Sequence, residues 1–153
     1  INATSAEVYK SIKLSKGIPQ SGQVVLDMTS ITNSDIADAK WNGKLVGHLK
    51  SPDFFDTTNY KTSSLKINKV TKVSEGTYNL IGELTIKGTT LPVTLSSKLE
   101  AKDNKAKSLK VDFSFDRTKY GIKYGSGSFF TNLGDKMISD QVSVSVELIL
   151  TEG

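Results

Sequence analysis

The sequence predicts an all-β protein, a single antiparallel β-barrel of about eight strands with one or two short helices in the 34–56 segment. Three observations support this fold class. Apolar and polar residues alternate over several runs, short turn-forming segments separate the runs, and no linker or repeat divides the 153 residues. A chain of this length buries a core as one domain, residues 1–153, without disulfides.

The alternation is strongest in four runs, each of which places apolar residues on one face of a strand. The residues of these dry faces are Tyr78, Leu80, Gly82, Leu84 and Ile86; Leu91, Val93, Leu95, Ser97 and Leu99; Leu109, Val111, Phe113 and Phe115; and Val142, Val144, Val146, Leu148 and Leu150. Two further strands are expected over residues 24–31 and 65–73. The turns at residues 74–77, 87–90 and 102–105 are too short for a parallel crossover, so they join antiparallel neighbours. A long meander with one dry face curls and closes.

Two segments interrupt the strand pattern. Residues 33–35 offer a helix N-cap, and a helical stretch runs from there towards Leu49. Gly43 and Gly47 weaken this stretch, so two short helices fit the sequence as well as one. The second segment, residues 120–140, contains several glycines and is expected to be irregular.

Composition excludes several classes of function. The net charge is +4, but every basic residue except Arg117 is a lysine and the lysines are scattered, which argues against a nucleic-acid reader. The absence of cysteine excludes disulfides, thiolate metal sites and a cysteine nucleophile. No run of about 20 apolar residues is present, so no transmembrane segment is expected. Transient contact with an anionic membrane surface stays open.

Few residues are suited to catalysis. His48 is the only histidine and no Gly-x-Ser-x-Gly turn accompanies it, so a structural hydrogen bond is its simpler interpretation. Asp27 falls on the strand face opposite Leu26, where a carboxylate paired with a lysine or hydroxyl is the simpler alternative to half of a catalytic carboxyl pair. Gly82 leaves room for a ligand or another backbone, or lets the sheet bend. No catalytic residue, metal site or cofactor is predicted.

Arg117 has two interpretations, and both stay open at this point. It follows Phe113 and Phe115, so at the mouth of an apolar cavity it could hold the phosphate or carbonyl head group of a ligand. Alternatively it pairs with Asp116 or Asp140 and fixes the loop that contains it, which is the role we favour.

Several segments, taken in order, resemble the YceI family of bacterial polyisoprenoid-binding proteins. They are residues 27–31 (DMTSI), 45–56 (LVGHLKSPDFFD), 82–93 (GELTIKGTTLPV) and 116–122 (DRTKYGI). The motifs GSGSFF and LGDK, within residues 125–136, resemble the branch of this family found in Bacteroidetes-type bacteria.

The resemblance implies an elongated, lipocalin-like barrel without an established catalytic activity. It predicts non-catalytic binding and transport of a long amphipathic lipid, a polyisoprenoid or an isoprenoid quinone, in the barrel interior. The residues expected to line the tunnel come from the dry faces and from the aromatic residues after the helix, with Arg117 as the polar candidate. They are Phe54, Phe55, Leu80, Leu84, Ile86, Leu95, Val111, Phe113, Phe115, Arg117, Val144 and Val146.

Location, assembly and closure of the barrel are further expectations. Since the chain begins at Ile1 without a methionine, we expect a removed signal peptide and a periplasmic or secreted location. An exposed edge strand is compatible with a homodimer. Residues 6–18 match the family's N-terminal strand pair poorly, which leaves closure open. Two alternatives stand beside the lipid carrier: an enzyme acting on a small hydrophobic substrate in the same cavity, and a stress-linked structural module with a filled core.

Overall fold

A single curled antiparallel sheet dominates the computed structural model, which describes residues 9–10, 13–15, 18–101 and 106–151. The eight strands are β1 (Tyr9–Lys10), β2 (Lys13–Ser15), β3 (Ile18–Asp27), β4 (Thr62–Ser74), β5 (Thr77–Ile86), β6 (Thr89–Ala101), β7 (Ala106–Asp116) and β8 (Gln141–Thr151). The helical elements are η1 (Met28–Ser30), α1 (Ala39–Lys50), η2 (Arg117–Tyr120) and η3 (Gly134–Lys136).

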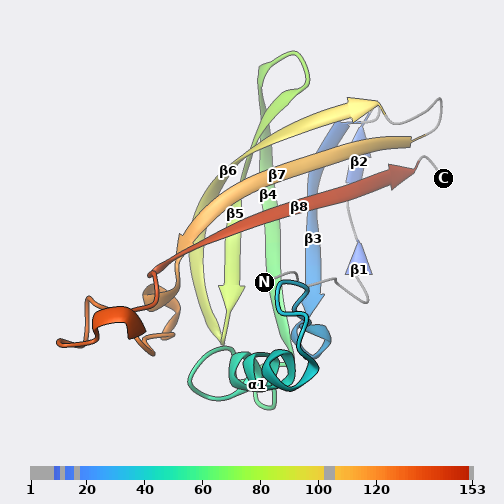
Figure 1. Ribbon diagram of the computed structural model, residues 1–153. Coiled ribbons are helices and arrows are strands. Elements are labelled where there is room, and N and C mark those ends of the chain that lie inside the picture. The colour runs from blue at the N-terminus through green and yellow to red at the C-terminus, as the bar shows by residue number, and fades with distance from the viewer. Residues whose placement is uncertain (1–8, 11–12, 16–17, 102–105, 152–153) are drawn as a thin grey trace.

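The strands follow the order β1-β3-β4-β5-β6-β7-β8, with β2 also paired to β3, and every pairing is antiparallel. The sheet curls into a half-barrel with α1 across one end (Figure 1). This architecture confirms the predicted all-β meander. Among the described residues no ladder joins β8 to β1, β2 or β3, so hydrogen bonding does not close the barrel there.

The strand predicted over residues 24–31 ends earlier than expected. β3 stops at Asp27, because the Asp27 carboxylate accepts the backbone N–H of Thr29 and caps η1. The strand instead extends further in the other direction, to Ile18. The strand expected over residues 65–73 is confirmed within β4.

The helix also begins later than the sequence suggests. Its N-cap is Asp38, whose carboxylate accepts the backbone N–H of Trp41, and not residues 33–35. The side chain of Asn33 accepts the N–H of Ile36 instead and belongs to a separate turn. From Ala39 the helix runs for 12 residues without a break at its two glycines, so the one-helix alternative is confirmed.

Two of the three predicted hairpin turns are confirmed. Between β5 and β6, Lys87 and Gly88 both have positive φ, 48° and 73°, which gives the backbone twist that a two-residue hairpin needs. Between β4 and β5, Gly76 supplies the positive φ of 70°. The third turn, at residues 102–105, lies outside the described residues.

Gly82 permits a close approach of two backbones. A Cβ at this position would overlap the carbonyl oxygen of Lys66 on β4 and lie 3.1 Å from the Cα of Ile67. The β4–β5 register shifts just beyond, between Ile67 and Lys69, where β4 bulges. Bulges increase the local twist of a sheet, so this contact helps the sheet to curl. Of the three interpretations, the approach of another backbone is observed directly, and the bend of the sheet accompanies it.

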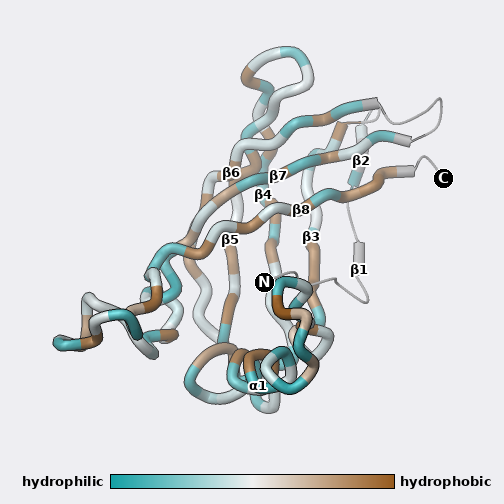
Figure 2. Tube along the Cα trace, viewed as in Figure 1, coloured by the Kyte–Doolittle hydropathy of each residue, from teal (hydrophilic) through white to brown (hydrophobic). Residues whose placement is uncertain are grey.

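The dry faces predicted from alternation form the concave face of the half-barrel. Figure 2 shows apolar positions recurring along these strands. The buried side chains form two clusters there. The α1-end cluster comprises Met28, Ile31, Leu49, Phe54, Leu84, Ile86, Phe115, Tyr120 and Ile122. The far cluster comprises Ile67, Leu80, Leu95, Leu109, Val111, Leu148 and Leu150. No helix in the described part of the chain is long and apolar enough to cross a membrane.

Candidate ligand-binding surface

Strand register brings apolar side chains of neighbouring strands together on the concave face. Leu80 of β5 pairs with Leu95 of β6, and Val111 of β7 pairs with Val146 of β8. Directly paired residues on one face lie within side-chain contact distance. The concave face is therefore a continuous apolar surface that extends over β5 to β8.

The structure places all eleven apolar residues predicted to line the tunnel on or against this surface. Six belong to the α1-end cluster or pack against it alone, namely Phe54, Phe55, Leu84, Ile86, Phe115 and Val144. Four belong to the far cluster or pack against it, namely Leu80, Leu95, Val111 and Val146. Phe113 packs against both clusters. Their contact with a ligand stays a prediction.

Some of these apolar side chains keep accessible surface. Leu80 is only 2% exposed and Leu109 is fully buried, so such residues act as core. Leu65, Val93 and Phe113, which pack against both clusters, are instead half-buried. On β8 the inward-facing valines are half-buried as well. We call six of these half-buried side chains, Leu65, Val93, Phe113, Val142, Val144 and Val146, the apolar strip.

Three members of the apolar strip were not among the predicted lining residues: Leu65, Val93 and Val142. Val93 and Val142 already lie on predicted dry faces, so the period-two pattern contained the signal for them. Leu65 lies in a predicted strand, but its face could be assigned only after its pairing with Val24 and Leu84 was known. Alternation marks a dry face, while the accessible part of that face depends on packing.

His48 lies outside the concave face and has structural partners. Its Nε2 is 3.1 Å from a carboxylate oxygen of Asp53, and its ring packs edge-on against Phe54 and Tyr124, with centroids 4.9 and 4.6 Å apart. This arrangement supports the structural interpretation. It links the end of α1 to the segment that follows β7.

Arg117 is buried, with 3% of its surface exposed. Its Nε and terminal nitrogens donate to four backbone carbonyls, those of Ile122, Tyr124, Ile138 and Ser139, at 2.8–3.0 Å. A fifth, longer contact of 3.5 Å reaches the carboxylate of Asp140. A guanidinium has five N–H groups, so none is left for a ligand head group. The geometry supports the loop-fixing role of Arg117.

Two carboxyl groups are stabilised in the charged form by local hydrogen bonds. Hydrogen bonds from the side chains of Ser126 and Ser128, followed by the charge of Arg117, hold the pKa of Asp140 below its ordinary value. The hydroxyl and backbone N–H of Thr29 lower the pKa of Asp27 in the same way. Asp27 thus has the hydroxyl partner that the simpler interpretation expected. In the part of the chain that the structure describes, no group of three or more His, Asp or Glu side chains could hold a metal ion.

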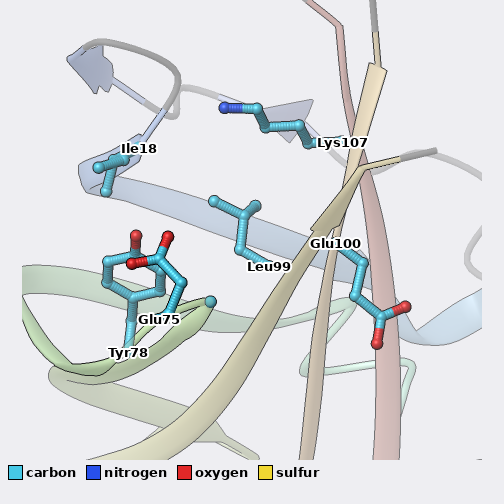
Figure 3. A pocket seen from close by; sticks show the side chains of 7 residues that line it. Ile18, Glu75, Tyr78, Leu99, Glu100 and Lys107 are labelled. Carbon is cyan, nitrogen blue, oxygen red and sulfur yellow. The ribbon is translucent and has the colours of Figure 1, made fainter. Parts of the chain in front are cut away.

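A pocket of about 230 Å³ lies between the β4–β5 hairpin, the start of β3, the end of β6 and the start of β7 (Figure 3). Its lining mixes apolar and charged groups: Ile18, Glu75, Gly76, Tyr78, Leu99, Glu100 and Lys107. Small-molecule sites usually have volumes of about 300–1,000 Å³ and mostly apolar walls. This pocket therefore does not hold a long apolar ligand by itself.

Comparison with known proteins agrees with this geometry. The model of the YceI-like domain matches residues 2–150. The chain belongs to the YceI-like family. The family predicted from the motifs is thus confirmed, while the Bacteroidetes-type branch stays a prediction.

Relatives of this YceI-like chain include two UPF0312 proteins. The protein from Vibrio parahaemolyticus is 30% identical over 81 residues, which cover 53% of this chain and 39% of the relative. The protein from Yersinia enterocolitica is 39% identical over 57 residues, which cover 37% of this chain and 29% of the relative. The matched regions thus span well under half of these relatives.

Solved structures share the fold over nearly the whole chain. The YceI protein of Campylobacter jejuni has a TM-score of 0.75 at 16% identity, covering 100% of this chain and 86% of that one. BcnA of Burkholderia cenocepacia has a TM-score of 0.73 at 20% identity, covering 95% and 84%. A polyisoprenoid-binding domain from Saccharophagus degradans, implicated in plant cell wall breakdown, has a TM-score of 0.66 at 15% identity, covering 94% and 82%. At these identities the similarity shows the fold.

Proposed function

We propose that this YceI-like chain binds a long amphipathic lipid, a polyisoprenoid or an isoprenoid quinone, along its concave face and carries it without chemical change. The observation that carries the proposal is the apolar strip, whose side chains join two buried clusters and still keep accessible surface. Its similarity in fold to the polyisoprenoid-binding domain from Saccharophagus degradans supports the choice of ligand class.

The dimensions and energetics of the surface suit a chain-like ligand. The accessible inward positions of β8 run from Val142 to Val146, four residue steps that span about 13 Å, and the same face continues to the buried Leu148 and Leu150. Each buried CH₂-sized group contributes about 0.8 kcal/mol, so a multi-unit tail binds tightly through area alone. Compact substrates would leave most of this surface in water.

The partners of the candidate polar groups support a non-catalytic role. Asp27 caps η1, His48 bonds to Asp53, and Arg117 is occupied by loop carbonyls. General acid–base catalysis needs a titratable group within reach of the substrate, and these three groups serve structural contacts instead.

Lipid analysis of the purified protein is the direct test. Organic extraction followed by mass spectrometry should recover an isoprenoid lipid, and titration of delipidated protein with geranylgeraniol or solanesol should saturate. Phe113→Ser, in the centre of the apolar strip, should weaken binding on the order of tenfold, because it removes most of a buried aromatic contact. Ile81→Ser is the matched control, since Ile81 lies on the outer face of β5 and is 37% exposed. A protein that carries no lipid and takes up neither alcohol would contradict the proposal.

A further inference from the structure

The loop between β7 and β8, residues 117–140, gathers exposed apolar side chains. Ten large hydrophobic residues are exposed in the described part of the chain, and five of them lie within residues 124–138. These five are Tyr124 (46% exposed), Phe129 (49%), Phe130 (50%), Met137 (62%) and Ile138 (38%). We call them the exposed cluster. Soluble proteins seldom concentrate such side chains in one segment unless the surface binds something.

The structure holds this loop in a defined conformation. The N–H of Ile138 donates to the carbonyl of Gly125 at 2.8 Å, and the N–H groups of Phe129 and Phe130 both donate to the carbonyl of Ser126. Ser126 is fully buried. Arg117 binds carbonyls on both arms of the loop, so the backbone is fixed from within. The exposed cluster is thus presented outward by a well-bonded loop.

The charge around the exposed cluster is positive. The loop carries the exposed residues Lys119, Lys123 and Lys136, whereas Asp135 is its only exposed acid. The other carboxylate of the loop, Asp140, accepts a hydrogen bond from Ser128 and contacts Arg117. The ammonium group of Lys123 lies 4.4 Å from the ring centre of Phe129, so a cation and an aromatic ring share one surface.

The neighbouring helix lies at the same end of the molecule as the loop. Tyr124 packs against His48 and Phe54, which ties the loop to the end of α1. Helix α1 contains three lysines, but three exposed acids, Asp35, Asp38 and Asp53, flank it, so the excess of positive charge at this end comes from the loop. Figure 1 shows the loop and α1 at the end of the half-barrel away from the β4–β5 hairpin.

We propose that the exposed cluster docks this protein on an anionic lipid bilayer. Aromatic and aliphatic side chains enter the boundary between head groups and acyl chains, while flanking lysines meet the negative surface. The loop leads directly into β8, where the half-buried Val142, Val144 and Val146 continue the apolar surface into the concave face. If the proposed lipid-binding function holds, the loop and the start of β8 form the route between the bilayer and the concave face. The docking itself does not depend on that function.

Vesicle co-sedimentation tests the docking. We expect the full chain to bind vesicles of equal parts phosphatidylglycerol and phosphatidylcholine more strongly than vesicles of phosphatidylcholine alone. The double variant Phe129→Ser/Phe130→Ser should lower the partition coefficient on the order of tenfold or more. Lys123→Gln/Lys136→Gln should lower it similarly at low salt and less at high salt, because ions screen the lysine contribution.

A matched control lies at the opposite end of the molecule. Val73 is 60% exposed near the end of strand β4, and Lys69 of the same strand is exposed as well. The double variant Val73→Ser/Lys69→Gln should bind vesicles as the wild type does. Equal binding to neutral and anionic vesicles, or an equal loss in this control, would overturn the proposal. Absence of vesicle binding would also overturn it, and a dimer, seen by sedimentation velocity, that the phenylalanine variant dissociates would then identify a second copy of this chain as the occupant of the exposed cluster.

Docking and lipid carriage can fail separately. The Phe113→Ser variant should keep vesicle binding and lose affinity for geranylgeraniol in detergent. The Phe129→Ser/Phe130→Ser variant should show the reverse, because its concave face is intact. If both variants lost both properties, the exposed cluster and the apolar strip would not be separate surfaces, and the docking proposal would be wrong.

Discussion

Replacing Arg117 by methionine gives the sharpest test of how the loop after β7 is built. The change keeps the apolar stem but removes five donors from four backbone carbonyls and Asp140. The carbonyl of Ile122 is bonded in a buried position, and its loss of a partner costs about 1–3 kcal/mol. The other three carbonyl contacts are partly buried, so water replaces part of each bond and we assign them about 0.5 kcal/mol each.

The sum for Arg117→Met is a loss of about 2.5–4.5 kcal/mol, a large part of a typical stability of about 5–15 kcal/mol. With a urea m value of about 2 kcal/mol per M, the unfolding midpoint should fall by about 1–2 M. Lys119→Met is the matched control, since Lys119 is exposed two residues away and should change stability by less than about 0.5 kcal/mol.

Ligand titration of the same variant separates the two roles first considered for Arg117. A loop-fixing arginine predicts that affinities for geranylgeraniol and geranylgeranyl phosphate change by the same factor. The reasoning would be refuted by a variant within about 1 kcal/mol of wild-type stability that loses affinity for the phosphate alone.

Two further predictions concern stability. Gly82→Ala should destabilise the fold by about 3 kcal/mol or more, because the added Cβ would overlap the Lys66 carbonyl. Gly43→Ala, which has open space around it in α1, should stabilise the fold by about 0.5–1 kcal/mol. Equal effects of the two variants in urea unfolding would contradict the close approach at Gly82. Because the folded-state pKa of Asp140 lies below its ordinary value of 3.8, its carboxylate stabilises the fold above that pH, and this contribution is lost as the pH falls through the lowered pKa. The stability difference between wild type and Asp140→Asn should therefore be constant near neutral pH and shrink below about pH 4, and a difference that grew on acidification would show the opposite sign.

The periplasmic or secreted location and the homodimer stay predictions. Fractionation of the source cells and sedimentation of the purified protein test them directly. Neither outcome changes the concave surface, because its residues come from one chain.

Local pattern was sufficient to predict the sheet and most of its apolar face. A strand alternates its side chains every two residues, so runs such as 78–86 and 142–150 show their inward positions without any knowledge of their partners. Hairpin turns are equally local, and the positive φ of Gly76 and Gly88 agrees with the turns predicted there. The family followed from short motifs in order, and the match over residues 2–150 confirmed it.

Element ends were less predictable because several residues compete to cap them. Asn33 and Asp38 are both good N-caps, and only the surrounding fold makes Asp38 the one that begins α1. In the same way the short hydrogen bond between Asp27 and Thr29 ends β3 within a stretch that still looks apolar enough to continue.

Contacts between distant segments were decided by the tertiary structure alone. Arg117 is buried because carbonyls up to 22 residues away converge on its guanidinium, which no local pattern reveals. The sequence identifies Phe113 and Phe129 alike as aromatic residues, yet one faces the concave surface and the other is held outward by the loop. Periodicity is a property of neighbouring residues along the chain, whereas the accessibility of a side chain depends on which distant segments pack over it. The sequence thus determined a sheet with an apolar face, and the tertiary structure decided which part of that face, and which loop beside it, stays accessible.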